Sequence, residues 1–139
     1  TQSLMTQHSL HESRKGYKIL LAEDNPINQK VTLYLLQRQG HQVKIANNGE
    51  EVLKSIKKEI FELILMDIQM PQMDGLKATA AIRLQEKKSK FHIPIIAMTA
   101  HALKGDREKC LDAGMNDYLS KPVNQNKLKK AIAGVMKKK

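Results

Sequence analysis

Short apolar runs alternate with helical patterns along most of the chain, and this alternation limits the folds that the chain can adopt. The apolar runs are residues 18–22, 41–46, 61–66, 93–99 and 117–120, and the helical patterns are residues 25–40, 48–58, 75–86, 105–114 and 124–136. Strands that alternate with helices in this way form βαβ units with parallel strands and right-handed crossovers. The pattern therefore predicts an α/β protein in which helices cover both faces of a parallel sheet.

Length and composition fit one domain of this kind. The chain has 139 residues, of which 41% are hydrophobic, enough to bury a core. Residues 1–16 are polar and aperiodic and are interpreted as a linker or tag remnant, which leaves residues 17–139 as the domain. No apolar run approaches the roughly 20 residues that a membrane span needs, so we expect no membrane contact by this domain. The single Cys110 has no disulfide partner in the chain, as is typical of a reducing compartment.

The net charge of +10 is unevenly distributed. Residues 123–139 contain six lysines and no acidic residue, a cluster typical of a solvated helix face and chain end. Only 4% of the residues are aromatic, so platforms on which bases could stack are scarce. We therefore do not expect this domain to bind nucleic acid, although the lysines could meet an acidic partner protein.

Polar side chains follow four of the predicted strands. Glu23 and Asp24 follow the first, Asp67 ends the third, Thr99 ends the fourth, and Lys121 follows the fifth. Each has an ordinary explanation, because an aspartate can cap a turn and a lysine can simply be solvated. Together they predict a site, because ligands bind parallel α/β sheets at the carboxyl ends of the strands.

The residue types indicate the chemistry of this site. Carboxylates gathered in one crevice repel one another unless a positive charge lies among them. Oxygen ligands without histidine or cysteine suit a hard cation, so we expect Mg²⁺, with Mn²⁺ as a second possibility. Lys121 and Thr99 would supply the charge and the hydroxyl donor that a phosphoryl group needs. Asp67 is then a candidate nucleophile that becomes an aspartyl phosphate.

At this point the sequence resembles the receiver domain of two-component response regulators. The resemblance covers roughly residues 17–137 and rests on four stretches in order: ILLAEDNPINQ, LILMDIQMPQMDG, IIAMTAHA and CLDAGMNDYLSKPV. It implies a flavodoxin-like, doubly wound five-stranded parallel sheet of order 2-1-3-4-5 with five flanking helices. The details are most similar to receivers at the C-terminal end of hybrid sensor histidine kinases.

The resemblance also implies roles around the predicted phosphoacceptor, Asp67. Asp24 and Asp67 would bind Mg²⁺ directly, together with the main-chain carbonyl of Gln69. Glu23, which stands where aspartate is commoner, would hold a metal-bound water. Lys121 would pair with the phosphoryl group.

Further positions are implied to act in switching and in the lifetime of the phosphate. Thr99 would bond a phosphoryl oxygen in the active state, and Tyr118 would then swing inward. The small Ala100 leaves access for the phosphate, whereas Gln69 and His101 occupy the variable positions that influence aspartyl-phosphate lifetime. The peptide bond between Lys121 and Pro122 is expected to be cis.

The implied function is a phosphoryl-accepting signalling domain in a phosphorelay. Its partners would be a histidine kinase and a histidine phosphotransfer domain, with Ile27 and Val31 on the first helix as part of the docking surface. The isolated domain would at most phosphorylate itself from small donors and dephosphorylate itself. We expect a monomer or weak dimer in the cytoplasm, including the cytoplasmic part of a membrane-bound sensor kinase.

Three other functions fit the sequence less well. A phosphatase of the haloacid-dehalogenase type also uses an aspartate at a strand tip, but it needs a second aspartate where this chain has Gln69. A nucleic-acid-binding module would have to rely on the lysine cluster alone. A flavin-binding protein would need a phosphate-cradling loop after the first strand, where Glu23 and Asp24 would repel the phosphate.

Overall fold

The computed structural model describes residues 16–70, 73–89, 91–100 and 105–137. They contain a parallel sheet of five strands in the order β2-β1-β3-β4-β5. The strands are β1 (Lys18–Ala22), β2 (Gln42–Ala46), β3 (Leu63–Asp67), β4 (Ile95–Thr99) and β5 (Asp117–Ser120). The predicted fold class and strand order are confirmed.

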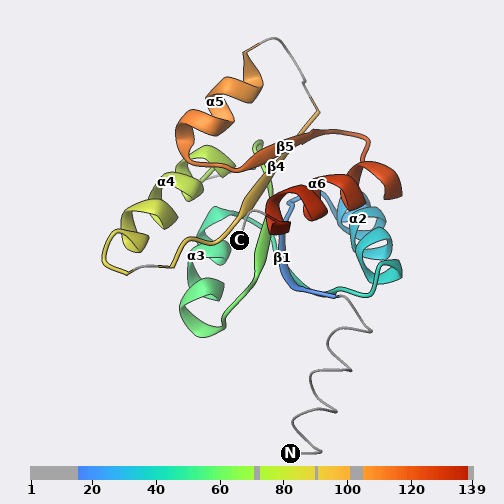
Figure 1. The fold of residues 1–139 in the computed structure, drawn as a ribbon, viewed down its shortest axis with the longest axis horizontal. Coiled ribbons are helices and arrows are strands. Elements are labelled where there is room, and N and C mark those ends of the chain that lie inside the picture. The colour runs from blue at the N-terminus through green and yellow to red at the C-terminus, as the bar shows by residue number, and fades with distance from the viewer. Residues whose placement is uncertain (1–15, 71–72, 90, 101–104, 138–139) are drawn as a thin grey trace, which may run out of the picture.

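Helices cover both faces of this sheet (Figure 1). α2 (Pro26–Arg38) and α6 (Gln125–Lys137) lie on one face, and α3 (Gly49–Lys58), α4 (Gly75–Glu86) and α5 (Asp106–Ala113) lie on the other. Within the described ranges, none of these helices is long and apolar enough to cross a membrane.

The core is divided by the sheet into two clusters. Because strand side chains alternate between faces, Leu20 and Ile64 pack toward α3 and α4, whereas Leu21 and Leu65 pack toward α2 and α6. Every residue of β3 and of β4 is buried, as expected for central strands of a sheet that is covered on both faces. Cys110 of α5 is buried in the first cluster, where it packs as a small apolar core residue.

The helices begin where the sequence places capping residues. The Asn25 side chain accepts hydrogen bonds from the N–H groups of Ile27 and Asn28, and Asn48 accepts one from Glu51. Each cap satisfies amide groups that the first helical turn leaves without a partner. α2 and α3 therefore start at fixed positions after β1 and β2. This fixes the loops that connect these strands to the helices at the edge where the site lies.

An apolar stripe of α2 that consists of Ile27 and Val31 faces solvent. Ile27 is 72% exposed and Val31 is 48% exposed, whereas Thr32 and Leu36 are buried. Neighbouring helix positions are about 100° apart around the axis. Thr32 and Leu36 rest on the sheet, and Val31, one position before Thr32, is turned toward solvent. The side of α2 beside the carboxyl edge of the sheet is consequently an exposed apolar surface.

Candidate functional site

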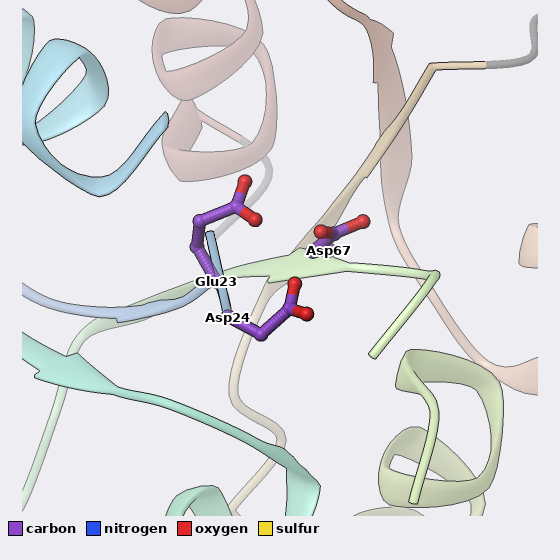
Figure 2. Close-up of side chains that lie close together, drawn as sticks. All are labelled: Glu23, Asp24 and Asp67. Atoms are coloured by element: carbon purple, nitrogen blue, oxygen red, sulfur yellow. The ribbon is translucent and has the colours of Figure 1, made fainter. Parts of the chain in front are cut away.

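Three carboxylates meet at the carboxyl edge of the sheet. Glu23 and Asp24 directly follow β1, and Asp67 is the last residue of β3, the strand beside β1. Figure 2 shows the three side chains close together, and each offers an oxygen within 4.8 Å of the others. Glu23 is 1% exposed and Asp67 3%, while Asp24 is exposed. The strand order changes direction between β1 and β3, so this is the topological switch point, where open α/β sheets bind ligands.

Lys121 reaches into this cluster from the end of β5. Its Nζ lies 2.8 Å from Glu23 Oε1 and 3.0 Å from Asp67 Oδ2. Its backbone N–H donates to the Thr99 carbonyl at 2.7 Å, and the peptide bond between Lys121 and Pro122 is cis. The single ammonium thus bridges the two buried carboxylates, which come from different strands.

Burial and these contacts shift the pKa values of Glu23 and Lys121. Burial raises the pKa of Glu23, which the hydrogen bond from Lys121 opposes and the neighbouring Asp67 reinforces. Burial alone would lower the pKa of Lys121, but its hydrogen bonds to Glu23 and Asp67 and their charges hold it above its ordinary value. Lys121 is therefore a cation at neutral pH, and Glu23 carries its charge at a cost to the fold.

The backbone after Asp67 folds closely around it. Asp67 Oδ1 accepts a hydrogen bond from the Gln69 N–H at 3.0 Å, and the Gly75 N–H donates to the Ile68 carbonyl at 2.9 Å. A Cβ atom at Gly75 would lie 2.4 Å from the Asp67 carbonyl oxygen, so only glycine permits this approach. Gly75 directly follows Asp74, and this pair of turn-forming residues is the sequence signal for a turn that shapes the loop after Asp67.

The remaining predicted site residues lie around this centre. Thr99 is buried at the end of β4, and Ala100 directly after it is exposed. Tyr118 lies half-buried in β5 and packs against the core cluster on the α4 side. The Gln69 side chain is exposed. The binding of a metal ion by the main-chain carbonyl of Gln69 stays a prediction. His101 lies outside the described residues.

A glutamine that the sequence analysis did not single out also touches the site. The side-chain amide of Gln29, one turn into α2, donates hydrogen bonds to the Glu23 carbonyl and to Asn47 Oδ1. Its position three residues after the proline that starts α2 carries no pattern that would have identified it, because the contact depends on how two loops meet in space.

The cluster has the donor set of a site for a hard cation. Its ligand atoms are all oxygens, two of the three carboxylates are buried, and one lysine is the cation that bonds to them. Three acids and one ammonium leave an excess of negative charge, which a divalent ion would neutralise. Exposed Asp24 leaves one side of the cluster open to the water molecules that Mg²⁺ retains. The residues therefore fit Mg²⁺.

Known proteins resemble the chain along almost all of the described domain. The family described as "Response regulator receiver domain" matches residues 19–133. Hybrid signal transduction histidine kinase I of Dictyostelium discoideum is 48% identical in an alignment of 120 residues that covers 83% of this chain and 7% of that protein. The signal transduction histidine-protein kinase BarA of Escherichia coli K12 is 40% identical over 84% of this chain and 12% of its own length. The chain thus corresponds to a small part of these relatives.

Two solved structures are similar in fold and sequence. The receiver domain of a sensor histidine kinase from Pseudomonas aeruginosa PAO1, with a magnesium ion coordinated in its active site cleft, is 44% identical with a TM-score of 0.76, covering 86% of this chain and 96% of that one. A co-crystal structure of the Saccharomyces cerevisiae histidine phosphotransfer protein Ypd1 and the receiver domain of Ssk1 is 38% identical with a TM-score of 0.76, covering 84% of this chain and 86% of the matched one. From the family match and these relatives together, the chain belongs to the receiver domains of two-component response regulators.

Proposed function

We propose that Asp67 accepts a phosphoryl group from a phosphohistidine and that the domain relays it to a histidine phosphotransfer protein. The observation that carries this proposal is the Asp67 carboxylate, buried at a strand tip, bonded to Lys121 at 3.0 Å and grouped with Glu23 and Asp24. A turn cap needs neither the lysine nor the second and third carboxylate, whereas phosphoryl transfer needs all of them.

The reaction follows from these contacts. An Asp67 carboxylate oxygen attacks phosphorus, the bond from phosphorus to the donor imidazole nitrogen breaks, and that nitrogen keeps the electron pair. Lys121, released from one carboxylate, pairs with the phosphoryl oxygens, and its raised pKa keeps it charged for this task. Bound Mg²⁺ would be held by Asp24, Asp67 and the Gln69 carbonyl, with Glu23 on a metal-bound water, and would neutralise charge on the phosphoryl oxygens. Mn²⁺, with the same oxygen preference, is the alternative ion.

The switch involves the strands beside Asp67. The Thr99 hydroxyl lies at the end of the adjacent β4, since Asp67 pairs with Met98 in the register, and it would donate to a phosphoryl oxygen. The small, exposed Ala100 leaves room for that oxygen. Tyr118 of β5 is half-buried and would move inward with Thr99, so that phosphorylation biases two arrangements of the β4–β5 side.

The partner surface lies next to the site. A groove of about 140 Å³ lies between α2 and the β5–α6 loop, and its lining includes Val31, Lys121 and Val123. It runs from the exposed stripe of Ile27 and Val31 to the lysine at the phosphoacceptor. An apolar helix of a histidine phosphotransfer protein that lies on this stripe would bring its histidine to Asp67. A cytoplasmic monomer or weak dimer, without bound nucleic acid, stays our prediction for the domain.

The test is intact mass spectrometry after incubation with acetyl phosphate and Mg²⁺. The native chain should gain one phosphoryl group, and Asp67→Asn should gain none. Asp112→Asn, which changes an exposed aspartate of α5, is the matched control and should behave as the native chain. A gain that persists in Asp67→Asn would refute Asp67 as the phosphoacceptor. Absence of any gain, together with failure to bind beryllofluoride, would refute phosphorylation as the function.

Transfer is tested separately with a purified histidine phosphotransfer protein and the phosphorylated chain. Loss of the label from Asp67 and its appearance on the partner histidine is the expected result. Ile27→Glu should slow this transfer without changing phosphorylation by acetyl phosphate, because it alters only the exposed stripe. Equal transfer rates for the two chains would rule out the α2 surface as the docking site.

A further inference from the structure

Gln29 joins two loops at the carboxyl edge of the sheet. Its side-chain Nε2 donates to the main-chain carbonyl of Glu23, which follows β1, and to Asn47 Oδ1, which follows β2. A primary amide has two N–H donors, so one side chain satisfies both acceptors. The contact links the loop that carries Glu23 and Asp24 to the loop that leads into α3.

The far end of this link is itself held in place. Asn47 donates its backbone N–H and its side-chain Nδ2 to Glu51 Oε1, at 2.9 Å and 3.1 Å. Since Nδ2 is committed to Glu51, the carbonyl oxygen of the Asn47 amide faces Gln29 as an acceptor. Glu51 in turn donates its N–H to Asn48, which caps α3. Gln29 is therefore anchored on a helix start and not on a free loop.

The near end of the link fixes the backbone that carries Asp24. The Glu23 carbonyl belongs to the peptide group between Glu23 and Asp24, and the Glu23 N–H donates to the Ala46 carbonyl at 3.1 Å. The Glu23 side chain has further support from Lys121 and from the Asn25 N–H. The Asp24 carboxylate makes no hydrogen bond or ion pair with any described residue, so its place in the cluster depends on this peptide group.

We infer that Gln29 is a positioning residue for the metal site, because it holds the Glu23–Asp24 peptide in the orientation that aims Asp24 at Asp67. This inference rests on the proposed function, in which Asp24 and Asp67 bind Mg²⁺ directly. Residues that orient metal ligands affect metal affinity even though they do not touch the ion. The same bonds connect the metal site to the β2–α3 loop, so binding of Mg²⁺ at the site would alter the conformation of that loop.

The first test compares Mg²⁺ binding by calorimetry in the native chain and in Gln29→Met, which keeps the length of the side chain and removes both donors. We expect about tenfold weaker binding, the lower end of the effect of losing a residue that orients metal ligands. Gln37→Met is the matched control, because Gln37 lies on the same helix, is exposed, and makes no side-chain hydrogen bond with the described residues. It should bind Mg²⁺ as the native chain does.

A second variant guards against a folding defect. Asn47→Ala changes an exposed residue and removes both the acceptor for Gln29 and the side-chain bond to Glu51, so it should weaken Mg²⁺ binding in the same direction with only a small loss of thermal stability. The double variant Gln29→Met with Asn47→Ala should be no weaker than Gln29→Met alone, because both changes break one chain of bonds. Unchanged affinity in Gln29→Met, or additive losses in the double variant, would overturn the inference.

Amide spectra without metal separate this inference from the proposed function. In the metal-free chain, Gln29→Met should shift the amide signals of Asp24 and Asn47 together, whereas Gln37→Met should shift neither. If the native chain bound no Mg²⁺, the metal part of the proposed function would fail, and the spectra would still decide whether Gln29 positions Asp24. An unshifted Asp24 signal in Gln29→Met would refute the positioning role even if the chain were phosphorylated normally.

Discussion

The substitution Gly75→Ala tests how tightly the fold is closed around Asp67. An added Cβ would lie 2.4 Å from the Asp67 carbonyl oxygen and 3.0 Å from Ile68 Cα. Both are backbone atoms, and the Gly75 N–H is bonded to the Ile68 carbonyl at 2.9 Å, so no flexible side chain can yield. To bring the first contact from 2.4 Å to at least 3.0 Å, the start of α4 or the end of β3 must move.

The size of the effect follows from two opposing contributions. Alanine in place of glycine favours a helix by roughly 0.5–1 kcal/mol. Overpacking of a closely packed contact costs roughly 1–3 kcal/mol, and Gly75 is the first residue of α4, where the gain in helix propensity is smallest. We therefore expect Gly75→Ala to lower the free energy of unfolding by roughly 1–3 kcal/mol.

Gly134→Ala is the matched control. Gly134 lies in α6, and a Cβ there would meet nothing within 4 Å, so this variant should be more stable than the native chain by roughly 0.5–1 kcal/mol. In urea unfolding, the midpoints of the two variants should then lie about 1 M apart, on opposite sides of the native midpoint. If Gly75→Ala proved as stable as Gly134→Ala, the close approach of α4 to Asp67 would be wrong.

Two further predictions concern buried polar groups. Burial raises the pKa of Glu23, so the fold is more stable when Glu23 is protonated. This contribution to stability is fully present below the ordinary pKa of 4.5 and is lost as the pH rises through the raised pKa. Glu23→Gln should accordingly melt at a higher temperature than the native chain at pH 7 without metal and depend less on pH above 4.5; coincident melting curves would contradict the raised pKa. The hydroxyl of Thr79 is buried in α4 without a hydrogen-bond partner among the described residues, so Thr79→Val should leave the free energy of unfolding unchanged or raise it by about 1 kcal/mol in urea titrations. A clear loss of stability in Thr79→Val would indicate that this hydroxyl has a partner.

Much of the fold could be predicted from local signals. Asn25 and Asn48 mark the helix starts, and the apolar runs mark the strands, since caps and buried strands depend on nearby residues. The sequence also brought Asp67 and Lys121 to one edge, because parallel strands place their carboxyl ends together whatever their order. The predicted strand over 93–99 begins at Ile95 instead, after Pro94, which has no N–H to give to a sheet.

Features that depend on how the elements are oriented in space could not be predicted from the sequence. Ile27 and Val31 were predicted as part of a docking surface, and it is the packing of Thr32 and Leu36 on the sheet that leaves both of them exposed. The link through Gln29 needs the loops after β1 and β2 to meet, which the register of these strands provides, with Ala22 opposite Ala46. No spacing along the chain could have indicated that glutamine.

The electrostatics of the site explain why its residues conflict with the stability of the fold. Glu23 and Asp67 are buried, Lys121 is the one described residue bonded to both carboxylates, and Asp24 adds a third negative charge within 4.8 Å. A sequence under selection for stability alone would place apolar or neutral residues at these strand ends, as it does along the rest of β3 and β4. In the proposed function, a divalent cation would lower this excess of negative charge, and the phosphoryl group on Asp67 would pair with the ammonium of Lys121. The same buried charges that oppose the stability of the metal-free fold would thus be the ones that hold the cation and position the phosphoryl group.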